Sequence, residues 1–247
     1  MIVTDPWFYI TAVPAVLIYG IGKGGLGGAL GIIAVPLMAL VVSPTQAAAI
    51  LLPILCVMDA FAVKQHYRSV DYSILRQMLP GSLLGVLLAG LFLSVTPESG
   101  LKLLIGVLSL LFCLQYVLGG SQQDSKPGKA SAWWWSSLSG FSSTAIHAGG
   151  GPASIYLLPL RLEKVSLIAT MAVLFAIINL AKLIPYSLLG EFDTTNLMTA
   201  LVLMPLAPVG VYMGVWLLHR VSQDVVYRLC YLFLFISGMK LVTDVLY

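Results

Sequence analysis

The sequence predicts an all-α polytopic membrane protein made of two inverted repeats, each with a glycine-broken re-entrant helical hairpin and three spanning helices. Of the 247 residues, 59% are hydrophobic and only 9% charged, against about 25% charged residues in an ordinary soluble domain. Several apolar runs approach or exceed the roughly 18 residues that indicate a membrane span. Two glycine-rich segments, residues 20–28 and 147–152, interrupt these runs.

Ten apolar segments follow one another along the chain, and one polar linker separates the first five from the last five. The predicted helical segments are 7–21, 26–42, 45–63, 74–95 and 100–118, then 133–146, 152–160, 165–188, 195–218 and 224–246. The linker is rich in Gly, Ser, Gln and Lys, which predicts a flexible connection. We therefore expect a first membrane repeat at 1–118, a cytoplasmic linker at 119–131 and a second, inverted membrane repeat at 132–247.

Each glycine-rich segment is followed by a short apolar stretch and a proline. Gly28 and Pro36 are eight residues apart, as are Gly151 and Pro159. Nine helical residues, such as 152–160, rise only about 14 Å, half of the roughly 30 Å apolar core of a bilayer. Broken backbone at membrane depth persists only where it is buried in protein or lines a wet cavity. We interpret each pair as a re-entrant hairpin, and two full spans joined by a tight turn are the alternative.

Landmarks recur at similar spacing in the two halves, which indicates a duplicated fold. Pro36 and Pro159 are 123 positions apart, and Pro80 and Pro205 are 125 positions apart. The repeated order of glycine and proline landmarks therefore assigns five segments to each repeat.

Basic residues occur in alternate connections, which predicts the orientation of the chain. The connections 43–45, 96–99 and 190–194 contain no Lys or Arg and are expected outside, whereas the basic connections are expected in the cytoplasm. The two sets alternate consistently only if each broken pair begins and ends on one side, so the second repeat is inverted. Inverted repeats with broken helices are typical of secondary transporters. The basic residues are Lys64, Arg68, Arg76, Lys126, Lys129, Arg161, Lys164, Arg220 and Arg228.

The first glycine tip combines backbone N–H groups with one cation, Lys23. Glycine lets the backbone approach a ligand closely, and helix N-termini favour anions, so this tip suits a small oxyanion. The alternative is that the pairs Gly24/Gly28 and Gly27/Gly31 only let helices pack closely. The substrate-binding candidates at this tip are Lys23, Gly24, Gly25 and Gly27.

The second glycine tip carries His147, which is able to donate to an anion and to couple substrate to protons. A hydrogen-bonded structural histidine is the equal alternative. The hydroxyls of residues 142–144 either supply donors or bond back to carbonyls of their own helix. The substrate-binding candidates at this tip are Thr144, His147, Gly149, Gly150 and Gly151.

Two further charges, Asp59 and Lys182, occupy equivalent places in the repeats, since they are 123 positions apart. At about 1.5 Å per residue, Asp59 lies roughly 21 Å below the outer end of its span, and Lys182 roughly 25 Å above the inner end of its own. This depth estimate puts them on opposite sides of the midplane and out of contact. We expect Lys182, with Asn179 one turn earlier, to bind substrate, and Asp59, with His147, to gate or relay protons; snorkelling is the alternative.

Other function classes lack support in the sequence. There is no H-E-x-x-H, G-x-S-x-G or Walker-type motif, and the three cysteines have no metal-binding spacing. We therefore expect no enzyme, no nucleotide-driven pump, no metal and no cofactor. The net charge of +3 is too small to indicate a nucleic-acid partner.

The two glycine motifs and the two-half organisation resemble the TauE/SafE family of membrane exporters for sulfite and organosulfonates. The resemblance rests on residues 22–28 with Pro36-Leu37 and on residues 147–152 with Pro159-Leu160, and it covers essentially the whole chain. It implies transport of small sulfur anions, such as sulfite or sulfoacetate, across a bacterial plasma membrane. Because Lys23 has no matching lysine in the second motif, which carries His147 instead, one asymmetric central site is expected.

The sequence thus predicts a secondary transporter that exports small sulfur oxyanions by alternating access. Its expected partners are a small anionic organosulfur substrate and membrane lipid, and a homodimer is compatible with this reading. The rival functions are an anion channel and an intramembrane enzyme or assembly subunit.

Overall fold

A computed structural model describes residues 2–25, 29–118, 128–217 and 223–246, and every regular element within these ranges is helical. The first half contains α1 (Pro6–Gly25), the 3-10 helix η1 (Ala29–Ile33), α2 (Ala34–Met38), α3 (Pro44–His66), η2 (Tyr67–Ser69), α4 (Tyr72–Val95) and α5 (Glu98–Val117). The second half contains α6 (Lys129–Ile146), α7 (Gly150–Leu157), η3 (Leu158–Leu160), α8 (Lys164–Leu188), α9 (Thr194–Leu203), α10 (Leu206–Leu217) and α11 (Gln223–Leu246). The all-α prediction is confirmed over these residues.

Polar side chains start several of the long helices. The hydroxyl of Ser43 accepts from the N–H of Gln46 at the start of α3, where Pro44 fits the first helical turn. The carboxylates of Asp71 and Asp193 accept from backbone N–H groups at the starts of α4 and α9. These caps satisfy N–H groups that have no partner inside the helix, and they define where the connections end.

Four helices within the described residues are long and apolar enough to cross a membrane. They are Pro6–Gly25, Pro44–Ser69, Tyr72–Val95 and Val165–Leu188. The pair α9 and α10 gives a fifth candidate, bent by 42° at the break. The sequence predicted one helix over 195–218, and the structure divides it at Pro205, which has no N–H to continue the helical ladder.

Both glycine-rich segments end a long helix, and only short helices follow. The first half has η1 and α2, of five residues each, and the second half has α7, of eight residues. At the second break His147 is in the left-handed conformation with φ 54°, and its N–H and that of Ala148 close the last turn of α6. A left-handed residue reverses the chain direction at a helix end, which is why α7 turns back beside α6.

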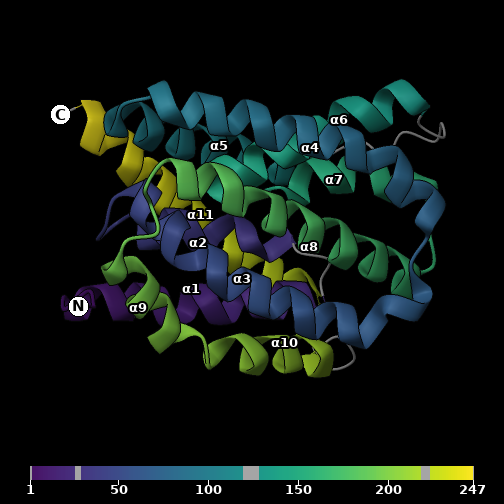
Figure 1. Ribbon diagram of the computed structural model, residues 1–247, viewed down its shortest axis with the longest axis horizontal. Coiled ribbons are helices and arrows are strands. Elements are labelled where there is room, and N and C mark those ends of the chain that lie inside the picture. Colours follow the sequence, from purple (N-terminus) through teal and green to yellow (C-terminus); the bar gives the residue numbers. More distant parts are fainter. Residues whose placement is uncertain (1, 26–28, 119–127, 218–222, 247) are drawn as a thin grey trace.

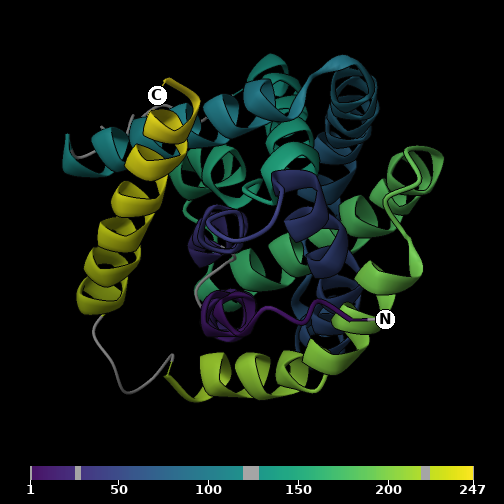
Figure 2. The same ribbon diagram turned by 90° about the vertical axis from the view of Figure 1, so that its left-hand side faces the viewer.

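The two halves are interleaved. Helix α1 of the first half packs along α10 of the second, and α4 of the first half packs along α6 of the second. Helix α3 packs along α8, and α5 along α11, so corresponding helices also meet each other. Figure 1 shows α1, α3 and α8 running along the long axis, and Figure 2 shows α11 on the outside of the bundle. The interior of the bundle is thus lined by helices from both halves.

The connections are sorted by charge between the two ends of the bundle. The connection with Arg68, the start of α6 with Lys129 and the connection with Arg161 lie at one end, on the right of Figure 1. The connections that precede α3, α5 and α9 lie at the opposite end, together with the start of α1 and the end of α11. The predicted alternation of basic and non-basic connections is therefore present in the fold.

Glycines of α1 and α10 let these two helices approach closely. A Cβ atom on Gly20 would lie 2.8 Å from Cα of Gly210, and the Cα of Gly24 faces the backbone of Val211. Small residues at this spacing allow backbone-to-backbone packing between membrane helices. The packing alternative therefore describes Gly24 better than a role in ligand contact.

Replacing Gly20 with Ala is expected to destabilise the protein by about 1–3 kcal/mol, because the added methyl group meets backbone atoms that have no room to move. The midpoint of thermal unfolding in detergent measures this loss. Gly128→Ala is the matched control, since nothing lies within 4 Å of a Cβ there and φ is −79°. Equal midpoints for the two variants would contradict close packing at this crossing.

Candidate functional site

Three side chains from three helices form a buried polar network beside the first glycine break. Lys23 on α1 forms an ion pair with Asp59 on α3. Asn179 on α8 donates from Nδ2 to the second carboxylate oxygen of Asp59 at 2.5 Å. All three are at most 8% exposed. The network therefore ties α1, α3 and α8 together in the interior.

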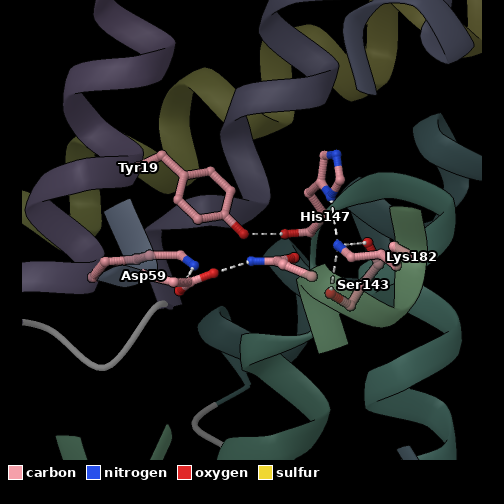
Figure 3. A network of polar contacts seen from close by, with 7 residues as sticks. Tyr19, Asp59, Ser143, His147 and Lys182 are labelled. Atoms are coloured by element: carbon pink, nitrogen blue, oxygen red, sulfur yellow. Dashed lines mark hydrogen bonds and ion pairs between the residues drawn. The ribbon is translucent and has the colours of Figure 1, made fainter. Parts of the chain in front are cut away.

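A second buried network surrounds the ammonium group of Lys182 at the other glycine break. Its Nζ atom lies 2.9 Å from the carbonyl oxygen of Ser143, 3.1 Å from the Ser143 hydroxyl and 2.8 Å from Nδ1 of His147. Lys182 itself is fully buried. Figure 3 shows Ser143, His147 and Lys182 grouped on one side of the site, with Tyr19 and Asp59 on the other.

The contacts of His147 determine its protonation state in this arrangement. Its Nε2 lies 2.9 Å from the carbonyl oxygen of Ala48, which only accepts, so Nε2 carries a hydrogen. Its Nδ1 faces the ammonium of Lys182, which only donates, so Nδ1 has a free lone pair. His147 is thus a neutral imidazole, assigned from the hydrogen-bond network.

Two tyrosines connect the glycine breaks to the surrounding helices. The hydroxyl of Tyr19 donates to the carbonyl oxygen of His147 at 3.0 Å, and that of Tyr186 donates to the carbonyl oxygen of Thr144 at 2.8 Å. Sequence reasoning missed both tyrosines. Helical spacing was the available signal, because Tyr19 lies four residues before Lys23 and Tyr186 four residues after Lys182, on the same helix faces.

Lys182 differs from Lys23 in how its charge is compensated. Lys23 has a carboxylate partner, whereas Lys182 meets a carbonyl, a hydroxyl and a neutral imidazole. Across the part of the chain that the structure describes, no carboxylate forms an ion pair with Lys182. A buried ammonium without a counter-charge attracts anions strongly, because there is little water to screen it.

A small cavity of about 10 Å³ adjoins the Lys23–Asp59 ion pair, with room for about one water molecule. Its other lining residues come from α3 and α8. Ile168 lies one turn into α8, which begins at the end of the bundle that carries the basic connections. The cavity therefore lies on that side of the ion pair. Its remaining lining residues are Ala62, Ile168, Met171, Ala172 and Phe175.

Acidic residues lie at the opposite end of the bundle. Burial, and then the negative charge of Asp193, raise the pKa of the Glu191 carboxyl above its usual range. The N–H of Glu191 bonds to the carbonyl oxygen of Tyr186 at 3.1 Å, so this loop lies directly beyond the Lys182 network. The end with Glu191 is thus unfavourable to anions, in contrast to the basic end.

The structure corrects the depth estimate for Asp59. The sequence placed Asp59 and Lys182 on opposite sides of the midplane, yet Asp59 accepts from Asn179, one turn before Lys182 on the same helix. The estimate treated the two spans as straight and independent, whereas α3 and α8 pack along each other. Asp59 and Lys182 have no direct contact among the hydrogen bonds and ion pairs of the described residues.

Lys23 and Thr144 also differ from their expected roles. Lys23 was expected to offer its charge to a ligand, but that charge is taken up by Asp59. The Thr144 hydroxyl donates to the carbonyl oxygen of Gly140 at 2.8 Å, within its own helix, as the alternative reading held. Ser143 takes the place in the site that was assigned to Thr144.

The glycine candidates divide between packing and site positions. Gly25 is the buried last residue of α1, and Gly27 lies outside the described residues. A Cβ on Gly149 would lie 2.7 Å from the carbonyl oxygen of Ser139 and 2.7 Å from Cβ of Ser143, so only glycine fits beside the Lys182 network. Gly150 and Gly151 form the first turn of α7.

Within the described residues, no group of three His, Cys, Asp or Glu side chains is placed to hold a metal ion. The site is instead one buried ion pair next to one buried ammonium, and both lie beside breaks in the helical backbone.

The sequence was also compared with known proteins. A family model described as "Sulfite exporter TauE/SafE" matches residues 12–241, which is nearly the whole chain. No curated protein and no solved structure matches the chain.

Proposed function

Because the chain belongs to the TauE/SafE sulfite exporter family, we propose that it is a secondary transporter that exports small sulfur oxyanions by alternating access. Sulfite and short organosulfonates are the proposed substrates, and a bacterial plasma membrane is the proposed location. The observation that carries the proposal is the fully buried ammonium of Lys182, which meets only neutral partners at the second glycine break.

We assign the substrate site to the space around Lys182, His147 and Ser143. The ammonium supplies the charge, and the glycine break supplies close access for a ligand, as Gly149 requires a position without a side chain. Asn179 and the Lys23–Asp59 pair form the adjoining wall. This assignment moves the centre of the site from Lys23, where the sequence placed it, to Lys182.

The distribution of charge supports export. Basic residues at one end of the bundle would gather anions from the cytoplasm, and Glu191 and Asp193 at the other end would disfavour their return. The membrane potential, negative inside, adds about 2.3 kcal/mol per charge per 100 mV in the same direction. A singly charged sulfonate is therefore able to leave without a coupling ion.

The packing of the two halves supports an inverted repeat. The contact between α1 and α10 corresponds to that between α6 and α4, and the pairs α3–α8 and α5–α11 correspond to themselves. Each broken helix pair also begins and ends at one end of the bundle, and the two pairs do so at opposite ends. In such an arrangement one repeat rocks against the other around a fixed central site.

The small cavity favours a carrier over a channel. About 10 Å³ beside Lys23 and Asp59 admits a water molecule but no sulfonate. An anion therefore passes this side of the site only when helices such as α3 and α8 separate. Movement of this kind gives saturable transport rather than continuous conduction.

Flux measurements on purified protein in liposomes test the proposal. We expect saturable uptake of labelled sulfite that is accelerated by unlabelled sulfite inside the vesicles. Ohmic single-channel currents would replace the carrier with a channel. Absence of any flux, together with turnover of a lipid or sulfur compound, would indicate an enzyme.

Cys56 offers a chemical probe of the site. It lies one turn before Asp59 on α3, is partly exposed, and is within electrostatic range of Lys23, Asp59 and Lys182. In a background with Cys113→Ala and Cys230→Ala, we expect a negatively charged thiol reagent to modify Cys56, and sulfite to slow the reaction about tenfold or more when it is present at ten times its Kd. Mass spectrometry measures the labelled fraction. Labelling that sulfite leaves unchanged would place the substrate away from Asp59.

A further inference from the structure

The buried charges of the site do not cancel. Lys23, Asp59 and Lys182 are the charged side chains buried in the described part of the chain, and His147 is neutral. Two ammonium groups against one carboxylate leave a single net positive charge. Burial of an uncompensated charge is costly, so a ligand of charge −1 completes the balance, whereas a ligand of charge −2 leaves the site negative.

One buried acceptor at the same place also lacks a partner. Asn179 is 1% exposed, and its Oδ1 has no hydrogen-bond donor among the described residues. The orientation of this amide follows from Asp59, because only the NH₂ group is able to donate to a carboxylate. A buried acceptor of this kind is satisfied by a ligand that carries an O–H or N–H group.

From these two observations we infer that the site selects singly charged anions that keep a hydrogen-bond donor. Asp59 sets the accepted charge, and Asn179 binds the donor. For sulfite this is the form that retains one proton. For sulfonates it is those whose second polar group is an uncharged donor. The inference rests on the proposed function and narrows its substrate class.

Three sulfonates of similar shape separate charge from donor. Sulfoacetamide carries one charge and a donor, methyl sulfoacetate carries one charge and no donor, and sulfoacetate carries two charges. Calorimetry on the purified protein should give at least about tenfold tighter binding of the amide than of sulfoacetate, since charges a few ångströms apart inside a protein interact strongly. The amide should also bind about threefold to tenfold tighter than the ester.

Variants of the ion pair test the role of Asp59. Asp59→Asn raises the net charge of the site to two, so the preference for the amide over sulfoacetate should disappear or reverse. Lys23→Gln with Asp59→Asn returns the net charge to one, and the wild-type preference should return. An unchanged preference in Asp59→Asn, or its loss in the double variant, overturns the charge balance. If Asp59→Asn does not fold, the wild-type protein and the double variant still decide the question.

A separate variant tests the role of Asn179. Asn179→Leu leaves the charge balance unchanged, so binding should still favour the amide over sulfoacetate, while the amide and the ester become equal. Retention of the full advantage of the amide over the ester assigns donor recognition elsewhere. If no sulfonate or sulfite binds to the wild-type protein, the proposed function itself fails. Equal wild-type binding of the amide and sulfoacetate overturns only this inference.

Discussion

Asp59→Asn is expected to lower the free energy of unfolding by about 3–5 kcal/mol, because it leaves the ammonium of Lys23 buried without a counter-charge. The ion pair is almost completely buried, with side-chain exposures of 6% for Lys23 and 4% for Asp59, so solvent screens little of this loss. The midpoint of thermal unfolding in detergent, measured by circular dichroism, reports the change.

The double variant with Lys23→Gln and Asp59→Asn distinguishes an unpaired charge from a lost contact. Removal of both charges is expected to restore most of the stability, because two neutral amides need far less hydration than one isolated ammonium. Lys240→Gln is a control, since Lys240 forms an exposed pair with Asp244 on α11, and such pairs contribute little. A double variant as unstable as Asp59→Asn would show that the hydrogen bonds, rather than the charges, hold α1 to α3.

Lys182→Gln is expected to reduce sulfite transport about 100-fold, equal to about 2.7 kcal/mol. Glutamine keeps two donors for Ser143 and His147, so the local hydrogen bonds largely remain while the buried positive charge is lost. Initial rates in proteoliposomes, normalised to the amount of folded protein, measure the effect.

Affinity and folding have to be separated in this experiment. Calorimetry should show a similar loss of sulfite affinity for Lys182→Gln, and size-exclusion chromatography should show an unchanged monodisperse protein. Lys240→Gln again serves as the control, with wild-type transport. Wild-type affinity in Lys182→Gln would remove Lys182 from the substrate site and return the assignment to Lys23.

The helices could be predicted from the sequence because membrane helices are defined by local composition. The runs around α3, α4 and α8 are apolar over 20 or more residues, and their ends at Ser43, Asp71 and Asp193 carry capping side chains. The helix division at Pro205 was missed, since proline breaks some helices and stays inside others, as Pro80 does within α4.

The sequence also located the site approximately. Lys23, Asp59, His147, Asn179 and Lys182 all stand out as polar residues in apolar surroundings, and the structure places all five in the two adjoining networks. An ionisable group inside a membrane is rare enough to mark function without further information. Their pairing was not predictable, because it depends on how four helices from two halves pack together.

By itself, then, the sequence determined the class of protein, the order of its helices, the sorting of basic connections and the set of polar residues at the two breaks. These properties depend on composition and local spacing, which are readable along the chain. Only the tertiary structure decided that Asp59 neutralises Lys23, that Lys182 stays without a counter-charge, and that Gly24 belongs to a helix crossing. Each of these depends on distances between segments remote in sequence, and such distances follow from packing, which no local pattern encodes.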